Sequence, residues 1–156
     1  MSQQVLFVCL GNICRSPTGE AVLNRSIATL GVDVQVDSAG TIAAHVGHRA
    51  DPRMRAAGEA RGYRFDSRAR QVTADDLRPG RFDYVIAMDR ENLQDLRRLA
   101  AAETDHIVLL SDFLDSSWPR DVPDPYYGGP DGFEQVLDMI EAAVPAILKR
   151  LADRQT

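Results

Sequence analysis

The 156-residue sequence contains few cysteines: Cys9 and Cys14 are the only two, and both lie in one short stretch. Two cysteines in one loop do not make the disulfide framework of a small secreted domain, so they fit a reducing cytosol. No further Cys or His lies near His45 and His48 at a spacing suited to zinc, which favours surface histidines. The sequence therefore predicts a cytoplasmic protein that needs no metal and no other cofactor.

The sequence also lacks a long apolar run, an internal repeat and a low-complexity tract. Residues 1–4 are polar, and the apolar segment after them is too short for a signal peptide or a membrane span. We therefore expect no targeting segment and no membrane partner. With 44% hydrophobic residues the chain has material for one core, so we expect a single domain over residues 1–156. The sequence carries no signal for an oligomeric state.

Basic residues are outnumbered, and the formal net charge of −5 argues against nucleic acid as a partner. The charge is unevenly distributed. Residues 49–70 hold seven Arg against three acids, whereas residues 103–141 hold ten acids against one Arg. We interpret both runs as solvated surface, with attraction of an acidic phosphoprotein by the basic run as the alternative.

The most informative segment that is present runs from Val8 to Pro17 and reads Val-Cys-Leu-Gly-Asn-Ile-Cys-Arg-Ser-Pro. It follows the apolar run Val5–Val8, which predicts a short buried strand, and Pro17 is typical of the first turn of a helix. Backbone N–H groups at such a junction converge on an anion, and the helix dipole adds positive potential. The same field and Arg15 favour a thiolate, so we expect Cys9 to be largely ionised, a nucleophile inside a phosphate cradle.

This segment resembles a known family. Cys9 and Arg15, separated by five residues and followed by Ser16, resemble the signature of protein tyrosine phosphatases. The longer pattern Cys-Leu-Gly-Asn-Ile-Cys-Arg-Ser-Pro near the N-terminus resembles the low-molecular-weight branch of that superfamily. A lone cysteine is more often a small buried hydrophobe, but the arginine and the polar loop argue against that reading here. The resemblance covers nearly the whole chain and implies a four-stranded parallel sheet of flavodoxin-like strand order.

Hydrophobic periodicity and capping signals independently predict four strands that alternate with helices. Small polar residues at 37–41 predict a turn, residues 111–130 predict a long ordered loop, and Pro145 predicts a kink in the last helix. The alternation indicates an α/β fold, an open parallel sheet flanked by helices, with ligands at the carboxyl ends of the strands. The expected strands are 5–8, 34–36, 84–88 and 106–110, and the expected helices are 17–30, 52–61, one capped by Asp89, and one carrying apolar residues from 133 to 151.

A thiolate that displaces a phosphoryl group needs an acid to protonate the leaving oxygen. Asp124, in the run Asp-Pro-Tyr-Tyr-Gly-Gly, is the candidate, because Pro125 restricts it to an extended conformation. Taken alone, Asp-Pro more often opens an ordinary turn, but here it matches the family's general-acid loop. The resemblance implies two in-line displacements in which Cys9 attacks phosphorus, Arg15 clamps the phosphate, and Asp124 acts first as acid and then as base.

The resemblance also implies supporting roles. Asn12 matches an asparagine that holds a left-handed backbone conformation, and Ser16 matches a serine that donates to the thiolate. Ser38 matches the serine that braces this asparagine. Asp89 matches the family pattern as well, although we interpret it first as a helix cap. The expected substrate-binding residues are Leu10, Gly11, Asn12, Ile13, Cys14, Ser16 and two aromatic walls at the pocket mouth, Tyr126 and Tyr127.

Two positions depart from the pattern of some family members. Ala44 stands where many have an aromatic residue, which predicts a thinner or replaced pocket wall. Ser67 stands where some have a histidine, which puts that histidine's bracing of the loop in question. Family members that pair the two loop cysteines also imply a protective Cys9–Cys14 disulfide after oxidation of the nucleophile.

Three other functions compete with a tyrosine phosphatase. Arginine phosphatases of this fold carry Thr in place of Ile13 and an aromatic residue without a hydroxyl in place of Tyr126, so these two residues favour phosphotyrosine. Arsenate reductases of this fold need redox cysteines downstream, and none follows Cys14. A non-catalytic phosphotyrosine-binding module would not need a nucleophile, a clamp and an acid together. The sequence thus predicts a hydrolase whose partners are tyrosine-phosphorylated proteins, with an arginine phosphatase or a binding module as the alternatives.

Overall fold

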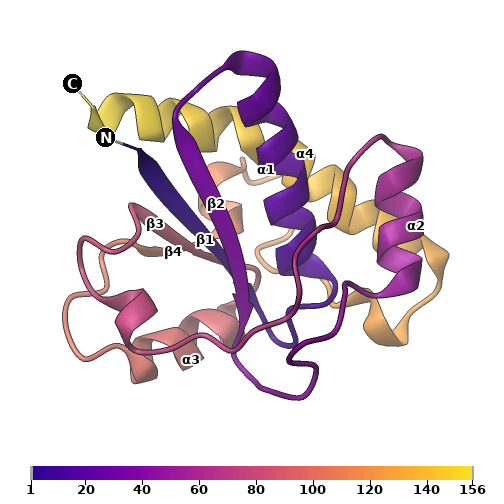
Figure 1. Ribbon diagram of the computed structural model, residues 1–156, viewed down its shortest axis with the longest axis horizontal. Coiled ribbons are helices and arrows are strands. Elements are labelled where there is room, and N and C mark those ends of the chain that lie inside the picture. Colours follow the sequence, from indigo (N-terminus) through magenta and orange to yellow (C-terminus); the bar gives the residue numbers. More distant parts are fainter. Residues whose placement is uncertain (1, 156) are drawn as a thin grey trace.

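The protein is built around a four-stranded parallel sheet (Figure 1). The computed structural model describes residues 2–155 except the side chain of Tyr127. Neighbouring strands are parallel throughout, so the predicted α/β class and flavodoxin-like order are confirmed. The central strand is fully buried from Val5 to Val8, as its continuous apolar sequence requires when helices cover both faces. The strand order is β2-β1-β3-β4, with β1 at Gln3–Cys9, β2 at Val34–Gly40, β3 at Tyr84–Ala87 and β4 at Ile107–Leu109.

Helices cover the two faces of the sheet (Figure 1). On one face α1, α2 and α4 enclose a core that includes Phe7, Leu23 and Leu137. On the other face α3 covers a second core that includes Leu6 and Leu96. None of the helices within residues 2–155 is long and apolar enough to cross a bilayer. The helices are α1 (Arg15–Leu30), α2 (Pro52–Ala60), α3 (Arg90–Leu99) and α4 (Pro130–Arg154).

The predicted capping signals act at the helix ends where the sequence places them. The Asp51 carboxylate accepts hydrogen bonds from the N–H groups at the start of α2, whose first residue is Pro52. The Asp89 carboxylate accepts from the N–H of Asn92 at 2.7 Å and caps α3. Helix α1 ends at Gly31, whose φ of +68° is the left-handed conformation that glycine adopts without strain. Helix α4 continues through Pro145 for 25 residues.

The predicted turn at residues 37–41 is wrong, because β2 stays extended through Gly40 and pairs with β1 as far as Cys9. The small residues serve a close approach instead of a turn. A Cβ on Gly40 would lie 2.8 Å from the Leu10 carbonyl oxygen and 3.1 Å from the Asn12 nitrogen. The end of β2 therefore packs directly against the loop that leaves β1. Helix α1 also begins at Arg15, two residues before the predicted start, and β4 ends before Leu110.

Candidate active site

The loop between β1 and α1 is held in shape by Asn12, which has a φ of +57°. Asparagine is one of the few residues that adopt this left-handed conformation readily. Its amide nitrogen donates to the hydroxyls of Ser16 and Ser38, at 2.8 and 3.0 Å, and its amide oxygen accepts from the Arg70 N–H at 3.0 Å. Asn12 thus ties the loop to α1, β2 and the segment after α2. The Ser38 hydroxyl in turn donates to Glu20 at 2.6 Å.

Cys9 ends β1 and lies at the base of this loop, only 3% exposed. Its Sγ lies 3.0 Å from the Ser16 hydroxyl in the first turn of α1, within the range of a sulfur hydrogen bond. Cys14, at the N-terminal end of α1, is also buried, and burial raises the pKa of its thiol well above the ordinary value, with Asp51 and Cys9 adding to the effect. Cys14 is therefore a neutral thiol at physiological pH, and both cysteines are free.

Arg15 is 2% exposed and sits among three acceptors from distant parts of the chain. Its Nη1 donates to Asp89 at 2.6 Å and to the Val122 carbonyl at 3.0 Å, and its Nη2 lies 3.6 Å from the Asp124 carboxylate. Burial by itself would lower the pKa of the guanidinium, but Cys9, Asp89 and Asp124 outweigh it and raise that pKa. The site therefore keeps a buried, permanent positive charge. Asp89 both caps α3 and holds this charge.

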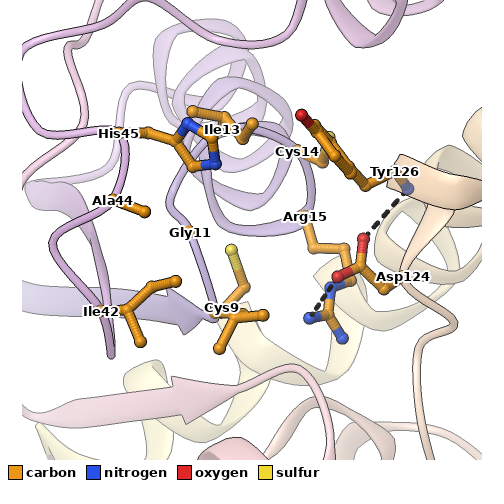
Figure 2. A pocket seen from close by; sticks show the side chains of 11 residues that line it. Cys9, Gly11, Ile13, Cys14, Arg15, Ile42, Ala44, His45, Asp124 and Tyr126 are labelled. Carbon is orange, nitrogen blue, oxygen red and sulfur yellow. Dashed lines mark hydrogen bonds and ion pairs between the residues drawn. The ribbon is translucent and has the colours of Figure 1, made fainter.

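The segment that carries Asp124 is anchored beside the end of β3. The Val122 N–H donates to the Met88 carbonyl at 3.0 Å, and Arg15 binds the Val122 carbonyl. Asp124 is extended, with φ −79° and ψ 114°, as the following proline requires, and its carboxylate accepts from the Tyr126 N–H at 3.0 Å. Asp124 opens a short 3₁₀ turn, Pro125–Tyr127, and its carboxylate points toward the neighbouring Arg15 guanidinium (Figure 2).

These segments enclose a cavity of about 260 Å³ with the Cys9 sulfur near its base (Figure 2). Two of the loop residues expected to bind substrate, Asn12 and Ser16, are buried and do not line this cavity, and their side chains support the loop. The predicted wall Tyr127 lies outside the described side chains. Within residues 2–155 no three His, Cys, Asp or Glu side chains are grouped to hold a metal ion. The lining residues are Cys9, Leu10, Gly11, Ile13, Cys14, Arg15, Ile42, Ala44, His45, Asp124 and Tyr126.

Two lining residues were not anticipated. His45, interpreted from sequence as a surface histidine, is only partly exposed and lines the cavity, and Ile42 lines it as well. Both residues lie close to Ala44 in the sequence, the position where we predicted a thinner or replaced pocket wall. That proximity is the only signal in the sequence that could have indicated them. Ser67, the second position that departs from some family members, hydrogen-bonds Glu20. Glu20 also accepts from Ser38, so Ser67 supports the loop indirectly.

Comparison with known proteins finds relatives along nearly the whole chain. Residues 4–156 match the family model described as low molecular weight phosphotyrosine protein phosphatase. A low molecular weight protein-tyrosine-phosphatase of Streptomyces coelicolor is 44% identical over 160 residues, which covers 99% of this chain and 96% of the relative.

Two solved structures share the whole fold. A protein tyrosine phosphatase from Entamoeba histolytica superposes with a TM-score of 0.92 at 40% identity, covering 99% of this chain and 100% of the other. YfkJ from Bacillus subtilis superposes with a TM-score of 0.92 at 39% identity, covering 100% and 98%. The chain therefore belongs to the low molecular weight phosphotyrosine protein phosphatase family.

Proposed function

We propose that the chain hydrolyses phosphotyrosine in proteins through a phosphocysteine intermediate, with Cys9 as nucleophile, Arg15 as phosphate clamp and Asp124 as general acid and base. Membership of the family supports the hydrolase activity itself. The roles are assigned from one observation: three reactive groups from different segments of the chain line one cavity of about 260 Å³. These are the Cys9 thiol at the end of β1, the Arg15 guanidinium at the start of α1, and the Asp124 carboxylate before the 3₁₀ turn that precedes α4.

The backbone of the loop is oriented to receive an anion. In a planar trans peptide the N–H points opposite to the C=O, so a carbonyl bound to the surrounding scaffold directs the following N–H to the other side. N–H groups arranged in this way at a helix N-terminus bind phosphate oxygens. Four carbonyl groups are bound to the scaffold, those of Cys9, Leu10, Ile13 and Cys14, which accept from the N–H groups of Thr41, Ile42, Asp51 and Thr18 at 2.8–3.3 Å.

The reaction proceeds in two displacements. The Cys9 thiolate attacks phosphorus, the bond from phosphorus to the tyrosyl oxygen breaks, and Asp124 donates its proton to that oxygen. Water then attacks phosphorus, Asp124 accepts the water's proton, and the sulfur–phosphorus bond breaks to return the thiolate. Arg15 and the loop N–H groups stabilise the charge on the equatorial oxygens in both steps. The Ser16 hydroxyl, 3.0 Å from Sγ, stabilises the thiolate as attacking and as leaving group.

The shape of the cavity favours an aryl phosphate. Ile13 and Tyr126 place apolar and aromatic surface above the nucleophile, where a phenyl ring would pack and a short phosphoserine side chain would not reach (Figure 2). Tyrosine-phosphorylated proteins are the partners that follow from this. The cytoplasmic location stays a prediction from the cysteine content.

The test is a panel of three peptides of one sequence that carry phosphotyrosine, phosphoserine or phosphoarginine at the same position. We expect the wild-type protein to release phosphate fastest from the phosphotyrosine peptide and a Cys9→Ser variant to release none. Preference for phosphoarginine would instead assign the arginine phosphatase alternative. Tight binding of the phosphotyrosine peptide without turnover would assign the binding module.

A further inference from the structure

The side chain of His45 points into the catalytic cavity and is less exposed than its neighbours in the same segment. In the surface segment from Ile42 to Arg49 every residue except His45 is exposed, whereas His45 is partly buried and lines the catalytic cavity. Its ring lies against the phosphate loop: a Cβ on Gly11 would lie only 2.9 Å from the His45 Cδ2. The imidazole therefore fills the space that a glycine leaves open at that point of the cradle.

The backbone around His45 is fixed at both ends. Ile42 donates to the Leu10 carbonyl at 3.1 Å, which joins the start of the segment to the phosphate loop. Its other end is joined to the segment after α2, because Gly47 donates to the Ala69 carbonyl at 2.8 Å. Between these anchors the His48 N–H closes a turn onto the His45 carbonyl at 2.9 Å. The imidazole is thus presented to the cavity by a hydrogen-bonded turn.

His45 faces Tyr126 across the mouth of the cavity (Figure 2). The two ring centroids are 6.0 Å apart with the planes inclined by 47°, within the range of direct aromatic contact. The neighbouring residue, Ala44, lines the same side of the cavity but offers only a methyl group. One flat side chain is thus present on each side of the mouth, although Ala44 itself offers none.

We infer that His45 is a specificity-determining residue whose imidazole replaces the missing aromatic wall and packs, opposite Tyr126, on the phenyl ring of the substrate. This inference rests on the proposed phosphotyrosine hydrolysis. A ring held between two others needs about 7–8 Å, twice a carbon–carbon contact of about 3.5–4.0 Å. The 6.0 Å pair must therefore open by about 1–2 Å to admit the substrate. The contact is made with the aryl group and not with the phosphate.

The test compares kcat and KM for a phosphotyrosine peptide with competitive inhibition by inorganic phosphate. In His45→Ala we expect KM to rise about 2- to 10-fold, the worth of one aromatic contact, while kcat and the inhibition constant of phosphate stay at wild-type values. His45→Phe restores a flat wall and should return KM to near the wild-type value. Ala44→Trp added to His45→Ala should recover KM as well, because it puts an aromatic wall on the same side.

Val46→Ala is the control, because it truncates the neighbouring side chain of the same turn, which is 51% exposed and lies outside the cavity lining. It should leave all three constants unchanged. An unchanged KM in His45→Ala, or a loss that His45→Phe does not restore, would overturn the role of His45. A parallel rise in the inhibition constant of phosphate would also overturn it, because His45 would then support the cradle. Absence of turnover in the wild-type protein would instead refute the proposed function.

Discussion

The buried Arg15 guanidinium depends on its hydrogen-bond and ion-pair partners, because a buried charge without partners is costly. Asp89 lies at 2.6 Å from it and also caps α3, so an alanine at position 89 would remove two interactions at once. Asp89→Asn separates them, since asparagine caps a helix as well as aspartate does but carries no charge.

We expect Asp89→Asn to lower the free energy of unfolding by roughly 1.5–3 kcal/mol, the range for a hydrogen bond to a charged group, because Arg15 keeps Asp124 and the Val122 carbonyl, and to weaken inhibition by phosphate. Urea unfolding at pH 7 measures the first effect. Asp95→Asn is the control, because Asp95 pairs at 3.3 Å with Arg98 on the exposed side of the same helix. That change should cost at most about 1 kcal/mol. Equal losses in both variants would show that Asp89 contributes only as an ordinary surface carboxylate.

Asp124 offers an equally clean substitution, because Asp124→Asn keeps the oxygen that accepts from the Tyr126 N–H but cannot donate a carboxyl proton. We expect kcat/KM for a phosphotyrosine peptide, which reports the first displacement and not the hydrolysis of the intermediate, to fall roughly 10²- to 10⁴-fold, the usual contribution of general acid catalysis. The loss of kcat/KM for p-nitrophenyl phosphate should be much smaller, because its phenolate leaves without protonation. Equal losses on the two substrates would mean that Asp124 positions its loop and does not transfer a proton.

The site residues that could be identified from the sequence are those that belong to a local sequence motif. Cys9, Arg15 and Asp124 stand in motifs, and the structure brings all three to one cavity. His45 could not be found in this way, since its role depends on which way one turn faces. Asp89 was interpreted as a cap because a cap is a local feature. Its contact with Arg15 joins positions 74 residues apart, which no local pattern shows.

At the scale of elements, the end of β2 determines the shape of the phosphate loop. Gly40 lies against the backbone of Leu10, Gly11 and Asn12, so an added methyl group would meet main-chain atoms at 2.8–3.1 Å that cannot rotate away. We expect Gly40→Ala to lower the free energy of unfolding by about 1–3 kcal/mol and to weaken phosphate inhibition, because the loop must shift.

Gly128→Ala is the control for that change. Gly128 has a φ of −104°, and an added Cβ would make only an ordinary contact, 3.8 Å from the Pro125 carbonyl. Thermal unfolding and phosphate inhibition measured on both variants separate the general effect of adding a methyl group from the specific collision. Wild-type phosphate inhibition in Gly40→Ala would show that β2 does not constrain the loop.

The helices and strands were predicted well where one periodic pattern and one cap define them. Asp51 with Pro52, and Gly31, mark helix ends that the structure confirms. The end of β2 was mistaken for a turn because small polar residues favour turns in general. Here tertiary packing decides the structure: residues 37–40 pair with β1, and they must be small where they contact the loop that follows β1. This constraint comes from a distant segment, so the sequence of residues 37–40 by itself does not reveal it.

At the scale of the whole molecule, the sheet separates two cores that belong to one predicted domain. Leu137 on α4 and Leu96 on α3 are fully buried in opposite cores. We expect Leu137→Ala and Leu96→Ala each to lower the free energy of unfolding by about 2–5 kcal/mol and to shift one shared transition. Far-ultraviolet circular dichroism and the fluorescence of Trp118 should report the same midpoint.

Leu30→Ala is the control for the two core variants, because Leu30 is 61% exposed at the end of α1. It should change the free energy of unfolding by no more than about 0.5 kcal/mol. Two separate transitions, or a loss in Leu96→Ala that Trp118 does not detect, would show that the two cores unfold independently and that the chain is not one cooperative domain.

The central claim, that Cys9 carries the phosphoryl group between the two displacements, is tested most directly by acid quenching during turnover. The Asp124→Asn variant is mixed with p-nitrophenyl phosphate, because that substrate forms the intermediate without an acid while hydrolysis of the intermediate lacks its base. Mass spectrometry of the digested protein should then find a phosphoryl group on the peptide that contains Cys9, and none in a Cys9→Ser protein treated identically. Phosphoryl transfer to another residue, or nitrophenolate release by Cys9→Ser at the wild-type rate, would contradict the account.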